Sequence, residues 1–301
     1  MKLHPALVEE LAVKPGDPAG LEKRSTTATS GSFLDPNGTV SAKKLAEGHL
    51  EIFKDELATA QELLYAAHSH ALLVIFQAPD AAGKDGTIKH VMSGVNPQGC
   101  SVSSFKVPSG EELDHDFLWR CSKVLPERGR IGIFNRSYYE EVLVARVHPE
   151  VLAGEGLPLV AGHGEKLWAA RYEDINAFER HLVRNGTRVV KFFLHVSKGE
   201  QKKRLLERLE DPAKYWKFSS ADLAGRAYFG DYQRAYEVAI TATSTPWAPW
   251  YVVPADHKYL MRALVAGVLT HTVEQLDLHL PKASPEQRAE IEQHRQALLA
   301  E

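Results

Sequence analysis

The sequence predicts an α/β protein of three layers, in which a mainly parallel five-stranded sheet lies between two layers of helices. Short apolar segments alternate with longer segments of helical periodicity, and three of the short segments are apolar along most of their length. Strands of that kind are covered on both faces, and they are parallel when helices connect them. The segments expected to be strands are residues 71–76, 100–107, 130–134, 188–196 and 250–253.

Helices are expected between these strands and at both ends of the pattern. The apolar spacing predicts them over residues 41–68, 87–92, 110–125, 165–185, 198–209, 221–241 and 256–276. A further helix is expected after Ser137, whose hydroxyl can accept a hydrogen bond from the first turn. The sequence SPEQ at 284–287 combines an N-cap, a proline in the first turn and a glutamine at the third position, which predicts a terminal helix.

The domain organisation is expected to be simple. Residues 1–40 contain many glycines and prolines and little periodicity, which favours an extended arm over the surface or toward a neighbouring subunit. Residues 41–301 then form a single domain, with a lid at about residues 200–230. No internal repeat and no low-complexity linker divides them.

Composition excludes several classes of protein. Of the 301 residues, 44% are hydrophobic and 25% are charged, as in ordinary globular domains, and the formal net charge is −3. That charge argues against general binding of nucleic acid, although a local basic groove is still allowed. The two cysteines, Cys100 and Cys121, lack CxxC spacing, and no apolar segment reaches membrane-spanning length. We expect a cytoplasmic protein that binds neither nucleic acid nor a membrane.

Residues 71–87, ALLVIFQAPDAAGKDGT, follow the order of strand, small-residue loop and helix, in which backbone N–H groups bind phosphate. Lys84 stands where the lysine of a phosphate loop neutralises phosphate charge. Ala78 replaces the first glycine of the usual pattern, and Asp85 replaces the Ser or Thr that binds magnesium. Asp80 offers carboxylate oxygens to Mg²⁺ in its place. Taken alone, the loop fits a tight turn with a surface lysine equally well.

Polar residues also follow the third predicted strand, at the sheet edge where open parallel sheets bind ligands. Asn135 stands where this kind of segment usually has an aspartate that binds metal. Since an amide carries no charge, metal binding is expected to depend more on Asp80 and on Glu140. The neighbouring tyrosines, Tyr138 and Tyr139, fit packing in a core better than stacking on a base.

A basic segment follows the fourth predicted strand. Its cations are Lys202, Lys203, Arg204, Arg208, Lys214, Lys217 and Arg226. Arg204 and Arg208 are four residues apart, so one helix face can direct both toward one anion. Phosphoryl transfer needs such cations around the equatorial oxygens, although a charge run is also typical of a solvated helix face. The histidines have no HExxH spacing, and no GxSxG or cysteine nucleophile context is present.

Together these segments resemble the family-2 polyphosphate kinases. The residues that carry the resemblance are APDAAGKDGTIKHV, NPQG, FNRSYYEEVLVARVHP, KFFLHVSKGEQKKRLLERLEDPAKYWKFS and WYVVPADHK, in order over roughly residues 31–271. The resemblance implies a P-loop kinase fold with a helical lid. It also implies transfer of the terminal phosphoryl group between inorganic polyphosphate and a nucleotide, with Mg²⁺ or Mn²⁺. The NRSYYEEV version is similar to the subgroup that phosphorylates both AMP and ADP, and the family suggests a homo-oligomer, either a dimer or a tetramer.

The resemblance also implies roles for individual residues. The expected catalytic residues are Asp80, Lys84, Asn135, Arg136, Glu140 and Arg208, of which Asp80 and Glu140 are the expected metal ligands. The expected nucleotide- and phosphate-binding residues are Ala81, Ala82, Gly83, Lys84, Asp85, Gly86, Arg136, Tyr139, Arg204, Arg208 and Lys217. Because polyphosphate is charged on every unit, it needs a line of cations, for which Lys84, Lys89, Lys106, Arg120 and Lys123 are the candidates.

Two other functions remain open from the sequence. An ATP-dependent nucleoside monophosphate kinase could use the same scaffold, and it would keep its full activity with ATP in place of polyphosphate. A regulatory protein that binds polyphosphate or nucleotides without turnover would explain the departures at Ala78, Asp85 and Asn135. Guanine nucleotides are further acceptors to be tested beside AMP and ADP.

Overall fold

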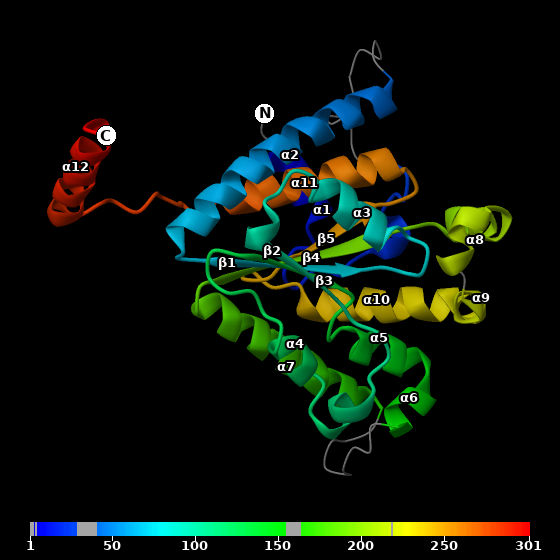
Figure 1. The fold of residues 1–301 in the computed structure, drawn as a ribbon. Coiled ribbons are helices and arrows are strands. Elements are labelled where there is room, and N and C mark those ends of the chain that lie inside the picture. Colours follow the sequence, from blue (N-terminus) through cyan, green and yellow to red (C-terminus); the bar gives the residue numbers. More distant parts are fainter. Residues whose placement is uncertain (1–2, 4, 29–40, 155–163, 218) are drawn as a thin grey trace.

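A parallel five-stranded sheet forms the centre of the molecule (Figure 1). The structure is a computed structural model that describes residues 3, 5–28, 41–154, 164–217 and 219–301. The strands lie in the order β2 (Cys100–Ser104), β3 (Ile131–Asn135), β1 (Ala71–Gln77), β4 (Thr187–His195) and β5 (Trp250–Pro254). All four pairings between neighbours are parallel, which confirms the predicted α/β fold class.

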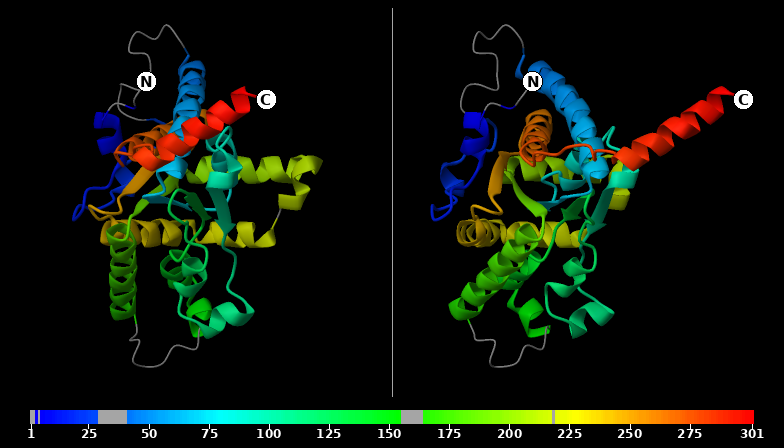
Figure 2. Two further views of the ribbon diagram at one scale, coloured as in Figure 1. Left: turned by 60° about the vertical axis from the view of Figure 1, so that its left-hand side comes forward. Right: turned by 90° about the vertical axis from the view of Figure 1, so that its left-hand side faces the viewer.

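Helices cover both faces of this sheet (Figures 1 and 2). One layer contains α1 (Pro5–Leu11), α2 (Ala42–Ala67), α3 (Lys84–Val91) and α11 (Lys258–Glu274), and the other contains α5 (Glu140–Val147), α7 (Glu165–Arg184) and α10 (Phe229–Thr243). Successive strand residues point to opposite faces, so Leu72 and Val74 enter the first core whereas Leu73 and Ile75 enter the second. Each of these side chains is fully buried and contributes roughly 1.5–3 kcal/mol of transfer free energy.

Serine side chains cap several of the described helices, and the cap at Ser284 is the one predicted from the sequence. The predicted cap at Ser137 is wrong, because α5 begins at Glu140 and its N-cap is Tyr139. Ser41 accepts a hydrogen bond from the backbone N–H of Lys44 at the start of α2. Ser197 does the same for Glu200 in α8 (Lys198–Glu210). Ser284 forms a complete capping box with Gln287, which confirms the terminal helix α12 (Pro285–Leu299).

The N-terminal segment lies against the body of the domain. Leu7 and Leu11 of α1 enter the core beneath α2 and α11. The backbone N–H of Val13 donates to Trp250 in β5, next to an antiparallel bridge between Ala12 and Tyr251. The described part of the predicted arm therefore includes a helix and shares the core of the domain. Residues 29–40 of that arm lie outside the described residues.

Two predicted helices are wrong in extent. Residues 110–125 form a 3-10 helix, η3 (Gly110–Asp114), and a single turn, α4 (Trp119–Ser122), because His115 between them has an extended backbone. The predicted helix 221–241 is two helices, α9 (Ser220–Ala227) and α10, which meet at Tyr228. The predicted loop 148–164 contains a short helix, α6 (Pro149–Gly154), before residues 155–163, which lie outside the described part.

The remaining helix, α12, extends away from the body at the end opposite α8 (Figures 1 and 2). None of its residues is buried. No helix in the described part of the chain is both long enough and apolar enough to cross a membrane.

Candidate active site

Two loops meet at the carboxyl edge of the sheet, at the point where connections leave neighbouring strands toward opposite sides of the sheet. The chain leaves β1 toward the edge strand β2, and it leaves β3 toward β4 on the other side. Ligands of open α/β sheets bind at such a point of reversal. The first loop is residues 78–83, here called the β1 loop, and the second is residues 135–139, here called the β3 loop.

The β1 loop has the backbone of a tight phosphate-binding turn. Gly83 precedes α3 with a φ of 110°, and a Cβ atom at this position would lie 3.2 Å from Met261 Cε, so glycine is required there. Ala81 also has a positive φ, of 61°. Lys84 opens α3, and its Nζ donates to the carbonyl of Ala78 over 2.7 Å. The lysine ammonium is therefore held inside the curve of the loop.

Side chains of the β3 loop reach across to the β1 loop. Nη2 of Arg136 donates to Oδ1 of Asp80 over 2.8 Å, and each of these side chains is 36% exposed. Nδ2 of Asn135 donates to Oδ1 of Asp85 over 2.6 Å. The structure thus brings together four of the predicted site residues from segments about fifty positions apart.

Both loops contain backbone strain. Ala81 and Arg136 have φ values of 61° and 65°, a region that costs a residue with a side chain about 1–3 kcal/mol. The backbone N–H of Arg136 donates to the carbonyl of Phe76 in β1, which holds the strained residue in place. Strain of this kind persists only where surrounding contacts determine the conformation, and it gathers at functional sites.

Charges of both signs lie near the loop contact. Burial lowers the pKa of Lys84, and nearby Arg136 lowers it further, against the carboxylates of Asp80 and Glu140. Burial raises the pKa of Glu140, against the opposing effect of Arg136 and Lys84. For Arg136, burial acts to lower the pKa, but Glu140 and Asp80 outweigh it and the pKa is raised. The cluster therefore holds two cations and two carboxylates close enough to influence one another.

The donor set of this cluster fits a magnesium ion. Mg²⁺ is usually held by one or two carboxylates together with substrate phosphates and water. Asp80 is partly exposed beside the loop, and Glu140 lies at the first position of α5. Within the described ranges, no group of three or more His, Cys, Asp or Glu side chains is arranged to hold a metal by itself.

Arg204 has a different place from the one that its sequence position predicts. It is 4% exposed, and its guanidinium donates to the carbonyls of Ala82 and Ala255 over 2.6 Å each. Further contacts join it to the carbonyls of Ala81 and Asp256. Nε donates to Oε1 of Glu200 over 2.9 Å. Because this carboxylate and the carbonyls take up the guanidinium donors, Arg204 anchors the β1 loop to the segment before α11 and is not placed as a phosphate contact.

Two other predicted ligands are buried in contacts with protein groups. Arg120 is 7% exposed and donates to the carbonyl of Lys106 and to Oε1 of Glu141, so it does not belong to an open groove. The hydroxyl of Tyr139 is fully buried and donates to Oε1 of Glu179. Both predictions relied on local residue type, whereas these partners come from α5 and α7.

The remaining predicted cations lie at the surface. Lys89 is exposed on α3, and Lys106 is exposed after β2. Lys123 is exposed as well, with its ammonium 4.1 Å from the centre of the Trp119 ring. On the lid side, Lys217 is exposed in the 3-10 helix η5 (Pro212–Lys217), and Arg208 is partly exposed in α8. Exposure alone neither confirms nor contradicts a role of these five cations in binding phosphate, so that role stays a prediction.

Sequence reasoning missed cations at the start of α11. Burial and the neighbouring Arg204 lower the pKa values of Lys258 and Arg262. A Cβ atom at Gly86 would lie 3.6 Å from Nη2 of Arg262, which places this guanidinium beside α3. The segment WYVVPADHK, which contributes to the family resemblance, includes this lysine, and it is the signal that could have indicated this position.

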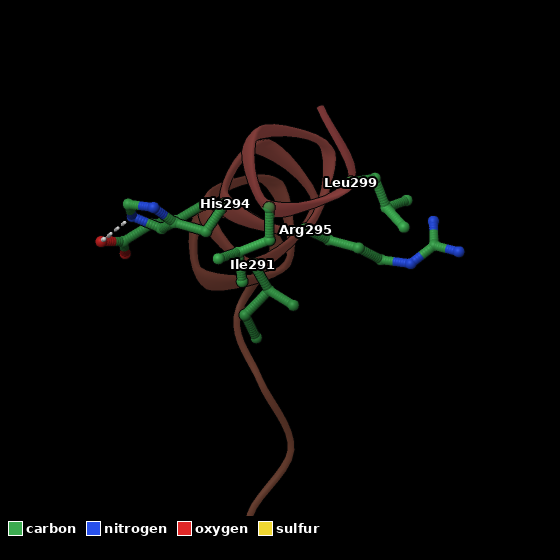
Figure 3. A pocket seen from close by; sticks show the side chains of 6 residues that line it. Ile291, His294, Arg295 and Leu299 are labelled. Atoms are coloured by element: carbon green, nitrogen blue, oxygen red, sulfur yellow. Dashed lines mark ion pairs between the residues drawn. The ribbon is translucent and has the colours of Figure 1, made fainter. Parts of the chain in front are cut away.

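A shallow hollow elsewhere on the molecule is a poorer candidate for the active site. It lies on α12, with a largely apolar lining that includes Ile291 and Leu299 (Figure 3). An apolar surface on a helix without buried residues does not suit a substrate that is charged on every phosphate. We therefore place the candidate active site at the β1 and β3 loops.

Comparisons with known proteins find relatives over most of the chain. A family model described as polyphosphate kinase 2 (PPK2) matches residues 41–281. The chain is 56% identical over 245 residues to an ADP-polyphosphate phosphotransferase of Rhodopseudomonas palustris, covering 81% of this chain and 85% of that protein. It is 45% identical over 252 residues to an AMP/ADP-polyphosphate phosphotransferase of Meiothermus ruber, covering 83% and 90%. The crystal structure of polyphosphate kinase 2 from Arthrobacter aurescens TC1 matches with a TM-score of 0.82 and 39% identity, over 98% of this chain and 97% of that chain.

Proposed function

The chain belongs to the polyphosphate kinase 2 family, and we propose that it transfers phosphoryl groups between inorganic polyphosphate and adenine nucleotides. The contact between Arg136 and Asp80 carries this proposal, because it joins the two loops beside Lys84. Little covalent work is required of the protein in such a transfer. Positioning and the neutralisation of phosphate charge supply most of the rate.

We assign Asp80, with support from Glu140, to hold Mg²⁺ or Mn²⁺. The bound metal would neutralise charge on the phosphates. Lys84 and Arg136 both lie near Asp80 and provide positive charge toward the transferring group. The half-buried Arg208 is a further cation for this role on the lid side.

The acceptors that we propose are ADP and AMP. The relative at 56% identity is named for ADP, and the relative at 45% identity is named for both nucleotides. Lys89, Lys106 and Lys123 remain our candidates for contacts with the polyphosphate chain, and Lys258 and Arg262 join them. We also propose a homo-oligomer in the cytoplasm, where the nucleotide substrates are abundant.

One assay tests this function against its two alternatives. Purified protein is incubated with polyphosphate, Mg²⁺ and AMP, ADP, GMP or GDP in turn, and the products are followed over time. We expect ADP and ATP to form, and a chelator to stop their formation. Full activity with ATP and AMP in the absence of polyphosphate would favour a nucleoside monophosphate kinase instead. Tight binding of polyphosphate without turnover would favour a regulatory protein.

Substitutions at the loop contact test the assignment of residues. Asp80→Asn and Lys84→Met should each lower kcat by roughly 10²-fold or more, the usual cost of removing a group that stabilises transition-state charge. Lys203→Met is the matched control, because Lys203 is exposed on the outer face of α8. Wild-type kcat in either loop variant would contradict the assignment.

A further inference from the structure

We propose that Gln201 is a positioning residue that holds the β1 loop to the lid helix α9. Gln201 lies on the inner face of α8 and is 3% exposed. Its Nε2 donates to the main-chain carbonyl of Asp80 over 3.1 Å. Its Oε1 accepts a hydrogen bond of 3.0 Å from Nη1 of Arg226, in the last turn of α9. One buried amide thus joins the loop of the candidate metal ligand to α9, which lies in the predicted lid region.

The two partners allow this amide a single orientation. A guanidinium can only donate hydrogen bonds, and a main-chain carbonyl can only accept them. Turning the Gln201 amide by 180° would set its NH₂ group against Arg226 and its oxygen against the Asp80 carbonyl. Arg226 is itself held to the first turn of α8, since Nη1 also donates to the carbonyl of Lys198 over 2.8 Å. The hydrogen bonds therefore all run in one direction, from Arg226 to Gln201 and from Gln201 to the carbonyl of Asp80.

The carbonyl that Gln201 holds is a sensitive point in the β1 loop. It belongs to the peptide unit between Asp80 and Ala81, so its direction sets ψ of Asp80 and φ of Ala81. That φ is 61°, in the region that a residue with a side chain keeps only when its surroundings enforce it. Arg136 holds the carboxylate of Asp80, and Gln201 holds its backbone. Loss of either contact should let the carboxylate turn away from its position.

Two variants separate the halves of the connection. Gln201→Glu keeps an acceptor for Arg226 but replaces the NH₂ group with an oxygen that repels the Asp80 carbonyl. Arg226→Met keeps Gln201 and removes the contact with α9. Arg234→Met is the matched control, because Arg234 is an exposed arginine of α10 that pairs with Asp231. Gln201→Met, which keeps the side-chain length, serves if the glutamate variant does not fold.

The first measurement is hydrogen exchange of the backbone amides in residues 80–83, which requires no enzymatic activity. We expect exchange to be faster in both variants by roughly 5- to 160-fold, the range for a buried partner left unpaired. The control should exchange at the wild-type rate. Unchanged exchange in Gln201→Glu or in Arg226→Met overturns the proposal, whether or not the protein transfers phosphate.

The second measurement rests on the proposed function and distinguishes positioning from direct phosphate binding. The Mg²⁺ concentration for half-maximal rate should rise in both variants, while KM for polyphosphate stays within about twofold. The double variant should need no more Mg²⁺ than the more affected single variant, because both changes break one connection. Additive effects, or a raised KM for polyphosphate in Arg226→Met alone, would show that Arg226 binds phosphate independently and would overturn the proposal.

Discussion

Replacement of Arg204 by methionine should destabilise the whole domain, because its guanidinium joins three segments that are distant in sequence. It donates to Ala82 in the β1 loop and to Ala255 after β5 over 2.6 Å each, with a weaker contact to Asp256. Methionine keeps most of the length of the side chain but leaves these carbonyls unpaired. The expected loss in free energy of unfolding is about 3–5 kcal/mol, because each buried carbonyl left unpaired costs about 1–3 kcal/mol and Glu200 also loses the guanidinium 2.9 Å away. Such a loss is a large share of the total stability of a typical domain.

Urea denaturation of the full chain measures this change, and two further variants isolate its cause. Lys203→Met alters the neighbouring residue, whose exposed ammonium lies 3.7 Å from Glu200, and should cost less than about 1 kcal/mol. Arg204→Lys keeps the charge but not the planar fork of donors, so it should recover less than half of the loss. If Arg204→Met instead unfolds at the wild-type urea concentration and only raises KM for polyphosphate, Arg204 binds substrate and the reasoning is refuted.

Three other expectations follow from burial and charge. Lys191→Met should lower the free energy of unfolding by about 3–5 kcal/mol in urea titrations, because it removes the ammonium 2.5 Å from the fully buried carboxylate of Glu179. A loss below about 1 kcal/mol would contradict this expectation. The folded state raises the pKa of Glu140, so the protonated carboxyl stabilises the fold at acidic pH, and this contribution is lost as the pH rises through the folded-state pKa. Glu140→Gln cannot ionise, so its free energy of unfolding should rise relative to that of the wild type over the same pH range. Thermal unfolding across pH would show no such divergence if the carboxyl were unperturbed. Removal of residues 284–301 should change the free energy of unfolding by less than about 0.5 kcal/mol, because α12 has no buried residue; a larger loss would show that α12 packs on the body or on another copy.

Much of the fold follows from local patterns that the sequence displays directly. The alternation of apolar strands with periodic helices predicts the parallel sheet, and β1, β3, β4 and β5 begin and end within two residues of their expected bounds. Ser284 caps α12 as expected, because an N-cap depends only on neighbours three residues away. Prediction fails between 110 and 125, where apolar spacing is helical but the extended backbone at His115 interrupts it.

The candidate site likewise has features that local sequence predicts and features that depend on packing. The β1 loop, its lysine and the polar end of β3 are predictable from local sequence, because each depends on residue types a few positions apart. Which cations are exposed and which are buried in contacts with protein groups depends on how distant segments pack. Arg204 and Arg120 have the residue type of a phosphate ligand, yet carbonyls and a carboxylate from other elements occupy them. Likewise, the partner of Gln201 is a backbone carbonyl 121 positions away. A buried polar group must be paired, and its partner is set by packing between segments that no local pattern connects.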